Sequence, residues 1–192
     1  MGPFSLFSTT GVLNQPGSAD VDDIARYCAD PVCQRFLSTP WPYERAHAES
    51  FVEQFVPEGW RSNTEWTWAI RERSDGPLLG IAAVRLGSGS VGFWLGAPHR
   101  GRGHMHAALS AIIDAVFART ELAEVTWEAT IGNVASLHTA QRAGFRYLGE
   151  GPGTIPDRDG HPVNSWIGTL GRDDDRSVQQ GWPDTTEWEA PL

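Results

Sequence analysis

The chain has 192 residues, of which 40% are apolar and 20% charged, a balance that predicts one globular domain with a buried core. Its formal net charge is −9 at pH 7. That acidic surplus argues against nucleic acid as the main partner, because phosphate binding needs a surplus of Lys and Arg, and it fits a cationic partner such as an amine better.

The N-terminal third predicts a short strand and two helices. Phe4–Leu6 is the strand candidate, and Ser18 is a good N-cap for a helix with its apolar positions on one face. Asp30-Pro31 ends that helix in this interpretation. A second helix covers residues 43–55 and is closed by Pro57. The turn-favouring residues of the loop between strand and first helix are Gly11, Pro16 and Gly17.

Strand patterns and helical periodicity alternate further along the chain. Residues 65–71 alternate in polarity as a strand does, and residues 103–119 repeat apolar side chains at helical spacing. The other expected elements are strands at 78–86, 91–95, 125–130, 145–149 and 164–170 and a helix at 136–143. This order predicts a mixed α/β domain around one central sheet.

The end of the chain differs in composition from the rest. From Gly171 onward the sequence is acidic and shows no periodicity. We therefore expect one domain over residues 1–170 and a mobile acidic tail over residues 171–192.

Three features of the chain bear on its compartment. No apolar run approaches the roughly 20 residues that span a bilayer, and the first residues lack the pattern of a secretion signal. Cys28 and Cys33 are the only cysteines, and a pair this close is a poor disulfide framework. We expect a cytoplasmic protein without membrane contact.

Residues 98–105 carry the strongest indication of chemistry. They lie between a predicted strand and the long helix, and Gly101 and Gly103 let the backbone approach a ligand closely. The helix dipole and exposed N–H groups favour an anion there, and Arg100 and Arg102 add positive charge. The loop predicts a pyrophosphate site, although a plain glycine turn is the alternative for the loop taken alone. No Gly-Lys-Ser/Thr follows, which excludes a Walker loop, and the dinucleotide fingerprint fits poorly without a third glycine.

This loop and a second motif together resemble the GNAT acetyltransferase superfamily. Residues 100–105 look like its acyl-CoA pyrophosphate loop, with Met105 where the family prefers a tiny residue. Downstream, Asn133-Val134-Ala135-Ser136 and Arg142-Ala143-Gly144-Phe145 resemble its Asn-x-x-Ser and Lys/Arg-x-Gly-Phe signature. Residues 92–95 are similar to a strand of its ribosomal-protein (Rim) branch. The resemblance implies a GNAT fold, with a mixed sheet of about six to seven strands, about four flanking helices, and two strands splayed into an acyl-CoA cleft.

The resemblance also implies a role for each matching residue. The backbone at Leu95 and Gly96 would hold the pantetheine arm. Asn133 would bond the pantetheine or order the site, and the Ser136 hydroxyl would protonate the departing CoA thiolate. Capping of the short helix is an alternative role for Ser136. The residues expected around the pyrophosphate are Arg100, Gly101, Arg102, Gly103, His104 and Met105.

Acetyl transfer to an amine also needs a base that takes a proton near neutral pH. Glu128 resembles the base of some N-terminal-alanine acetyltransferases, and strand alternation predicts that Glu128 and Trp127 face opposite sides of the sheet. An exposed strand carboxylate is the alternative interpretation. The other acids that the resemblance offers are Glu150, Asp157 and Asp159. The tryptophans expected on the acceptor side, most of them in the core, are Trp41, Trp60, Trp66 and Trp68.

The sequence therefore predicts an N-acetyltransferase that uses acetyl-CoA as co-substrate and no metal. His104 and His106 point away from each other at their helical spacing, which disfavours a metal site. The expected acceptor is an amine, on a protein N-terminus or a small molecule, and a homodimer is left open. Two rival hypotheses are a non-catalytic acyl-CoA-sensing module on the same fold and another phosphate-binding protein that shares only the glycine loop.

Overall fold

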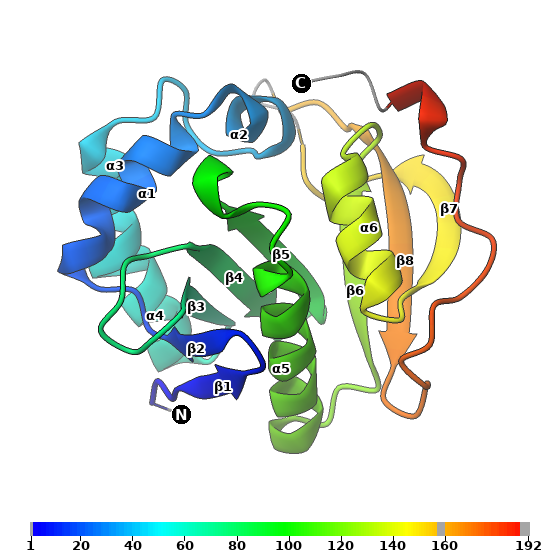
Figure 1. The fold of residues 1–192 in the computed structure, drawn as a ribbon, viewed down its shortest axis with the longest axis horizontal. Helices are drawn as coiled ribbons and strands as arrows, with labels where there is room; N and C mark the ends of the chain where they lie inside the picture. The colour runs from blue at the N-terminus through cyan, green and yellow to red at the C-terminus, as the bar shows by residue number, and fades with distance from the viewer. Residues whose placement is uncertain (1, 157–159, 189–192) are drawn as a thin grey trace.

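The computed structural model describes residues 2–156 and 160–188, folded around one eight-stranded sheet (Figure 1). Its strands lie in the order β1-β2-β3-β4-β5-β6-β8-β7. They are β1 (Leu6–Ser8), β2 (Gly11–Asn14), β3 (Glu65–Arg71), β4 (Gly80–Arg85), β5 (Ser90–Leu95), β6 (Glu124–Thr130), β7 (Arg146–Pro152) and β8 (Asn164–Gly171). All neighbours are antiparallel except β5 and β6, which run parallel. The predicted mixed sheet is confirmed, with eight strands where six or seven were expected.

Helices cover both faces of this sheet. They are α1 (Val21–Cys28), α2 (Pro31–Phe36), α3 (Arg45–Ser50), α4 (Val56–Ser62), α5 (His104–Arg119) and α6 (Val134–Arg142). α5 and α6 pack against one face and contribute Leu109 and Leu137 to the main core, while α1 and α3 contribute Ile24 and Ala48 to a second core on the other face. None of the helices in the described ranges combines the length and apolar content that crossing a membrane requires.

Two features of the N-terminal third differ from the sequence prediction. Gly11–Asn14, expected to be part of a loop, is a strand that pairs with β3 and buries Leu13 completely. Asp30-Pro31 follows the end of α1, as predicted, and it also begins a further helix, α2, which was not predicted. The Asp30 carboxylate accepts a hydrogen bond of 2.7 Å from the Val32 N–H, and Pro31 stands at the first helical position, where its missing N–H costs nothing.

The second predicted helix begins at Arg45 and continues past Pro57 to Ser62. A π-helical segment, Phe51–Phe55, joins α3 to α4 and places Pro57 in the first turn of α4. A proline is tolerated there because the first-turn N–H groups need no partner within the new helix. Asn63, in the left-handed conformation with φ of 57°, ends the helix instead.

The N-terminal aromatic cluster, formed by Phe4, Trp60, Trp66 and Trp68, anchors one end of the main core. The Phe4 ring lies 5.3, 5.3 and 5.6 Å from the three tryptophan rings in that order, and the tryptophans are almost fully buried. Arg119, the last residue of α5, lies 4.1 Å from the Phe4 ring. The cluster therefore packs at the opposite end of α5 from the glycine loop. The prediction that most of these tryptophans lie in the core is confirmed for Trp60, Trp66 and Trp68, and a place on the acceptor side stays a prediction.

The C-terminal aromatic cluster, formed by Trp127, Tyr147 and Trp182, joins the sheet to the last segment of the chain. The Trp182 ring lies 5.7 Å from the ring of Trp127 on β6 and 5.4 Å from the ring of Tyr147 on β7. Arg176 pairs with Asp114 on α5 at 2.8 Å. The segment beyond Gly171 thus contacts the body of the protein, while its mobility and the domain boundary at residue 170 stay predictions.

Candidate functional site

The parallel strands β5 and β6 pair only near their beginnings. Their register covers Ser90 with Thr126 and Val91 with Trp127. Beyond these residues β5 pairs only with β4, as far as Leu95, and β6 pairs only with β8. The two strands therefore diverge toward their carboxyl ends, as Figure 1 shows. The backbone edge at the end of β5 is left without a partner strand.

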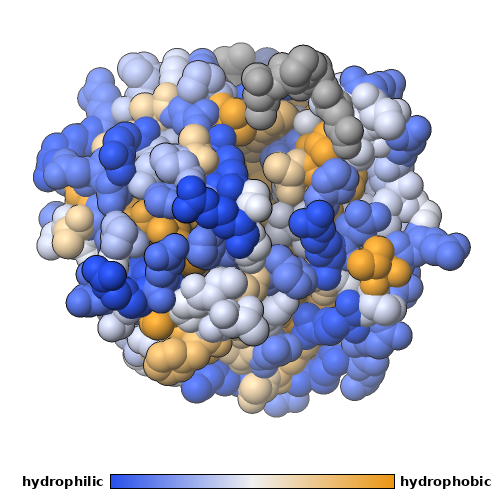
Figure 2. All heavy atoms as spheres, viewed as in Figure 1, coloured by the Kyte–Doolittle hydropathy of each residue, from blue (hydrophilic) through white to orange (hydrophobic). Residues whose placement is uncertain are grey.

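A cavity of about 350 Å³ lies where the strands diverge. Its walls come from α2, the end of β5, the glycine loop with the start of α5, and α6. In Figure 2 apolar side chains come to the surface in a hollow at the upper centre of a largely hydrophilic face. The predicted site residues that line the cavity are Leu95, Arg100, Gly101, Gly103, Met105, Asn133 and Ser136. Gly96, Arg102, His104 and Glu128 are not among its lining residues.

The wall formed by α2 was missed by the sequence analysis. Val32, Cys33, Phe36 and Leu37 face the cavity from this helix and its end. Burial raises the pKa of the Cys33 thiol, which keeps it protonated near neutral pH. The signal that was available is Asp30-Pro31, since an Asp followed by Pro is as good a helix start as it is a helix stop.

The glycine loop has the geometry of an anion site. Gly101 and Gly103 have φ of 74° and 81°, in the left-handed region, and open space surrounds both. A bond from the Ala107 N–H to the Gly103 carbonyl marks the beginning of α5. The N–H groups of His104, Met105 and His106 precede that bond in the first turn and have no partner within the helix. An anion placed against them also meets the positive end of the helix dipole.

The two arginines of this loop differ in their surroundings. Arg100 donates from Nε to the Leu95 carbonyl at 3.1 Å and pairs with Asp30 at 3.0 Å, so it ties the end of β5 to the start of α2. Arg102 is exposed and has no hydrogen bond or ion pair within the described residues. Arg102 is therefore the freer of the two charges for a ligand.

Three other loop residues direct their side chains into the core or toward neighbouring elements. The Met105 side chain is buried in the main core, which leaves its backbone N–H as the group available to a ligand. His104 is 7% exposed, and its Nε2 lies 3.8 Å from the Glu72 carboxylate. His99 Nε2 lies 2.8 Å from the Tyr27 hydroxyl. Burial and the charges of Arg102 and His104 lower the pKa of His99, so its imidazole is neutral at pH 7.

Gly96 stands where no side chain fits. A Cβ at this position would lie 2.7 Å from the Tyr27 ring, and the Gly96 N–H donates to the Leu79 carbonyl at 2.9 Å. Gly96 therefore lets α1 pack directly against the end of β5 and fixes the direction in which the glycine loop leaves the sheet.

Asn133, not Ser136, caps α6. The Asn133 side chain accepts from the Ser136 N–H at 3.3 Å, and α6 begins at Val134. The alternative role of Ser136 as N-cap is therefore wrong. The Ser136 hydroxyl oxygen instead accepts a 3.0 Å bond from the Trp127 indole N–H at the cavity wall.

Glu128 lies on the opposite face of β6 from Trp127, as predicted. Its carboxylate accepts from the N–H groups of Thr154, at 2.9 Å, and of Ile155, at 2.8 Å, in the segment after β7. The Glu150 carboxylate accepts from the Trp166 indole N–H at 3.2 Å. Of the other candidate acids, Asp157 and Asp159 lie outside the described residues.

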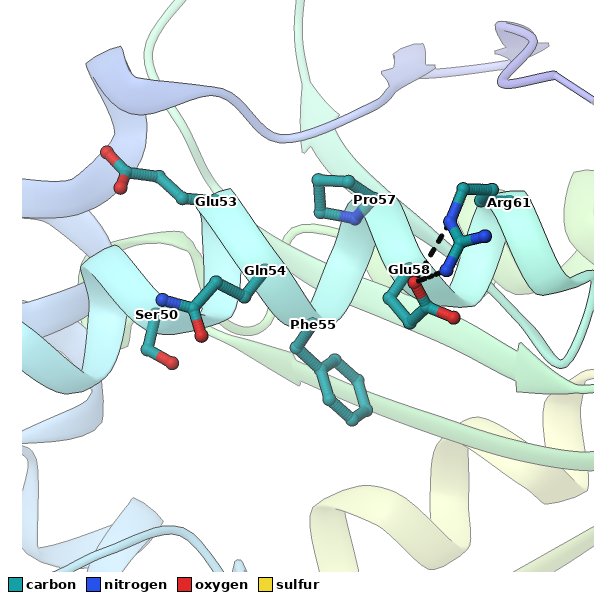
Figure 3. Close-up of a pocket in the computed structure, with 7 residues that line it drawn as sticks. All are labelled: Ser50, Glu53, Gln54, Phe55, Pro57, Glu58 and Arg61. Atoms are coloured by element: carbon teal, nitrogen blue, oxygen red, sulfur yellow. Dashed lines mark hydrogen bonds and ion pairs between the residues drawn. The ribbon is translucent and has the colours of Figure 1, made fainter.

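A second hollow, of about 590 Å³, lies on α3 and α4, and its lining residues are drawn in Figure 3. Arg61 there bonds to Glu58 of its own helix, and Phe55 is exposed at the rim. This hollow shares no residue with the cavity at the glycine loop. Across the described ranges, no three His, Cys, Asp or Glu side chains gather closely enough to hold a metal ion, and a metal-free site stays a prediction.

Comparisons with known proteins agree with this geometry. The model of the acetyltransferase (GNAT) domain family Acetyltransf_3 matches residues 12–146. A candidate ribosomal-protein-serine acetyltransferase from Vibrio cholerae has a structure similar over 89% of this chain and 99% of its own, with 22% identity and a TM-score of 0.76. A search of curated protein sequences found no match.

Two further solved structures share the fold. Mycobacterium smegmatis RimJ, in complex with CoA-disulfide, is similar over 90% of this chain and 91% of its own, with 18% identity and a TM-score of 0.73. The microcin C7 self-immunity acetyltransferase MccE, in complex with acetyl-CoA and AMP, is similar over 83% of this chain and 91% of its own, with 17% identity and a TM-score of 0.70. Likeness at these identities shows the fold.

Proposed function

The chain belongs to the GNAT acetyltransferase family, and on that premise we propose that it transfers the acetyl group of acetyl-CoA directly to an amine. The divergence of β5 from β6 beside the glycine loop is the observation that carries the proposal. An unpaired strand edge suits the amides of a pantetheine arm, and first-turn N–H groups suit a pyrophosphate. α2 and α6 form two walls of the cavity in which the acyl group would lie.

The residues of the cavity fit acetyl-CoA, which supplies an activated thioester when it is bound. The N–H groups at the start of α5 and the Arg102 guanidinium would hold the pyrophosphate. The backbone at Leu95 would hold the pantetheine arm, since a carbonyl oxygen has a second lone pair beside the one that Arg100 uses. Open space at Gly101 and Gly103 leaves room for a phosphate against the backbone.

Two side chains are proposed for the proton transfers. Ser136 lines the cavity and would give its proton to the leaving thiolate. Glu128, on the other face of β6, would take a proton from the attacking amine. Its two oxygens offer about four lone-pair sites, so the bonds from Thr154 and Ile155 leave it able to accept another.

The acceptor is proposed to be the amine of a protein N-terminus. The likeness to the Vibrio cholerae protein, whose name refers to ribosomal-protein serine, supports a protein acceptor. The likeness to RimL, which is named a ribosomal L7/L12 alpha-N-protein acetyltransferase, supports the N-terminal amine. A small-molecule amine is the second candidate, because the same scaffold serves many acceptors.

The test follows the release of CoA thiol from acetyl-CoA with three acceptors. They are a peptide with a free N-terminal amine, the same peptide with that amine blocked, and a polyamine. We expect release with the free peptide and none with the blocked one. Release with the polyamine alone would move the acceptor to the small-molecule class. Acetyl-CoA binding without release for any amine would replace the transferase with the sensing module.

A further inference from the structure

Trp127 connects the proposed proton donor to the C-terminal segment. Its indole is 1% exposed and donates to the Ser136 hydroxyl oxygen at 3.0 Å. An indole N–H is a donor only, so the serine oxygen must be the acceptor in this bond. The serine O–H is therefore not used by Trp127 and stays available to an acceptor in the cavity that Ser136 lines.

Trp182 packs behind the Trp127 ring. The two rings lie 5.7 Å apart with an interplanar angle of 56°. The Trp182 indole nitrogen is buried and lacks a hydrogen-bond partner among the described residues, so this side chain acts here through packing. Its segment is fixed by the ion pair of Arg176 with Asp114 and by close backbone packing, since a Cβ on Gly144 would lie 2.8 Å from the Arg176 Cα.

We propose that Trp127 is a positioning residue for Ser136, and that Trp182 holds the Trp127 indole in place from the C-terminal segment. This inference rests on the proposed role of Ser136. In the transfer, the amine nitrogen bonds to the acetyl carbon as the carbon–sulfur bond breaks, and the leaving sulfur takes the Ser136 proton. Glu128 takes the proton that the amine loses, and this proton then returns to the Ser136 hydroxyl through water. The indole N–H turns the serine oxygen's proton toward the cavity and stabilises that oxygen while it lacks the proton.

The direct test replaces Trp127 by Phe, which keeps a ring and removes the N–H. We expect kcat to fall about tenfold, with the KM for acetyl-CoA unchanged, because one oriented hydrogen bond is lost. Trp166→Phe is the matched control. Trp166 is equally buried on the neighbouring strand β8, and its indole N–H goes to Glu150 instead. The control should keep kcat, and an equal fall in both variants would overturn the proposal.

A double-mutant comparison separates positioning from general support. In a Ser136→Ala background, Trp127→Phe should have no further effect on kcat. The same tenfold fall in that background would show that Trp127 acts independently of Ser136, and would overturn the inference while leaving acetyl transfer intact. Full kcat in Ser136→Ala alone would remove the proton donor and this inference with it. Absence of turnover in the wild-type chain would instead refute the proposed function itself.

The role of the C-terminal segment has its own variant. Trp182→Ala removes the ring behind Trp127 and changes no residue of the β-sheet itself. It should lower kcat in the wild-type background but not in Ser136→Ala. Trp188→Ala is the control, because the Trp188 ring contacts Trp166 at 6.4 Å. Equal kcat values for the two alanine variants would overturn the contribution of Trp182.

Discussion

The two aromatic clusters bury the same kind of ring but send their indole N–H groups to different partners. In the N-terminal aromatic cluster, Trp60 donates to the Thr67 carbonyl and Trp68 to the Phe4 carbonyl. Trp66 donates to the side-chain oxygen of Asn63. None of these acceptors lines the cavity at the glycine loop. In the C-terminal aromatic cluster, Trp127 donates to a side-chain hydroxyl in the wall of the cavity. Burial alone therefore does not distinguish a structural tryptophan from one that supports chemistry. The position of the hydrogen-bond partner does, since within the two clusters only the hydroxyl that Trp127 reaches lines the cavity.

The largest expected effect tests the structural role of the N-terminal aromatic cluster. Trp68→Ala should lower the free energy of unfolding by about 3–5 kcal/mol, because a fully buried ring leaves a cavity in the main core. The folded fraction should keep its acetyl-CoA binding, since the cluster lies at the far end of α5 from the glycine loop. Denaturant unfolding and titration measure the two quantities. Phe7→Ala, at a side chain that is 80% exposed, should change the unfolding free energy by less than about 0.5 kcal/mol.

The second prediction concerns Ser136, the hydrogen-bond partner of Trp127 in the cavity wall. Ser136→Ala should lower kcat about 100-fold, the usual contribution of a positioned acid. It should also lower the unfolding free energy by about 1–3 kcal/mol, because the buried Trp127 N–H loses its acceptor. Asn133→Ala is the contrasting variant, because Asn133 is the cap of α6 and its loss should cost about 1 kcal/mol of stability. Steady-state kinetics and thermal unfolding of both variants check this. Unchanged kcat in Ser136→Ala would contradict the assignment, whatever its stability.

Glu128 is the hardest residue to assign to a structural or a chemical role. Its carboxylate is bonded to backbone N–H groups, which by the rule above marks a structural residue. As the proposed base it should nevertheless lose about 100-fold in kcat on Glu128→Gln, with acetyl-CoA binding retained. Glu124→Gln, at the other end of β6 and bonded to Thr169, is the control and should keep kcat. Unchanged turnover in Glu128→Gln would show that Glu128 only holds the segment after β7 in place, and that another residue is the base.

The smallest expected effect extends the comparison to the two loop arginines. Arg102→Ala should weaken acetyl-CoA binding about fivefold at low salt and less at high salt, because an exposed charge is screened. Arg100→Ala should also lower the unfolding free energy, since Arg100 joins Leu95 to Asp30. Calorimetric titration at two salt concentrations, with thermal unfolding beside it, separates the two roles. Equal unfolding temperatures for the two variants would contradict the distinction.

The parts of the fold that could be predicted are those with a regular local signal. The apolar periodicity of α5 and the alternation of β3 each identify one element, and the glycine loop between β5 and α5 indicates where the proposed anion site lies. Strand β2 and helix α2 carry no unambiguous signal of this kind. Gly11 favours a turn, and Asp30-Pro31 is compatible with both the end and the beginning of a helix. The failure to predict α2 was the most serious, because this helix forms one wall of the cavity.

The finer features of the site depend on contacts between distant parts of the chain. Arg100 and Arg102 are equivalent within the loop motif, and only the position of Asp30 shows that Arg100 is engaged. The bond from Trp127 to Ser136 likewise requires β6 and α6 to be packed together first. Sequence patterns record local periodicity, so such pairings become visible only in the folded chain.

The central claim is tested most directly by calorimetric titration of the purified chain with acetyl-CoA, with CoA and ATP as comparisons. The account predicts acetyl-CoA binding with a dissociation constant of about 1 μM that ATP does not match. Absence of acetyl-CoA binding at high protein concentration would contradict it, because the glycine loop and the diverging strands would then have no acyl-CoA to hold.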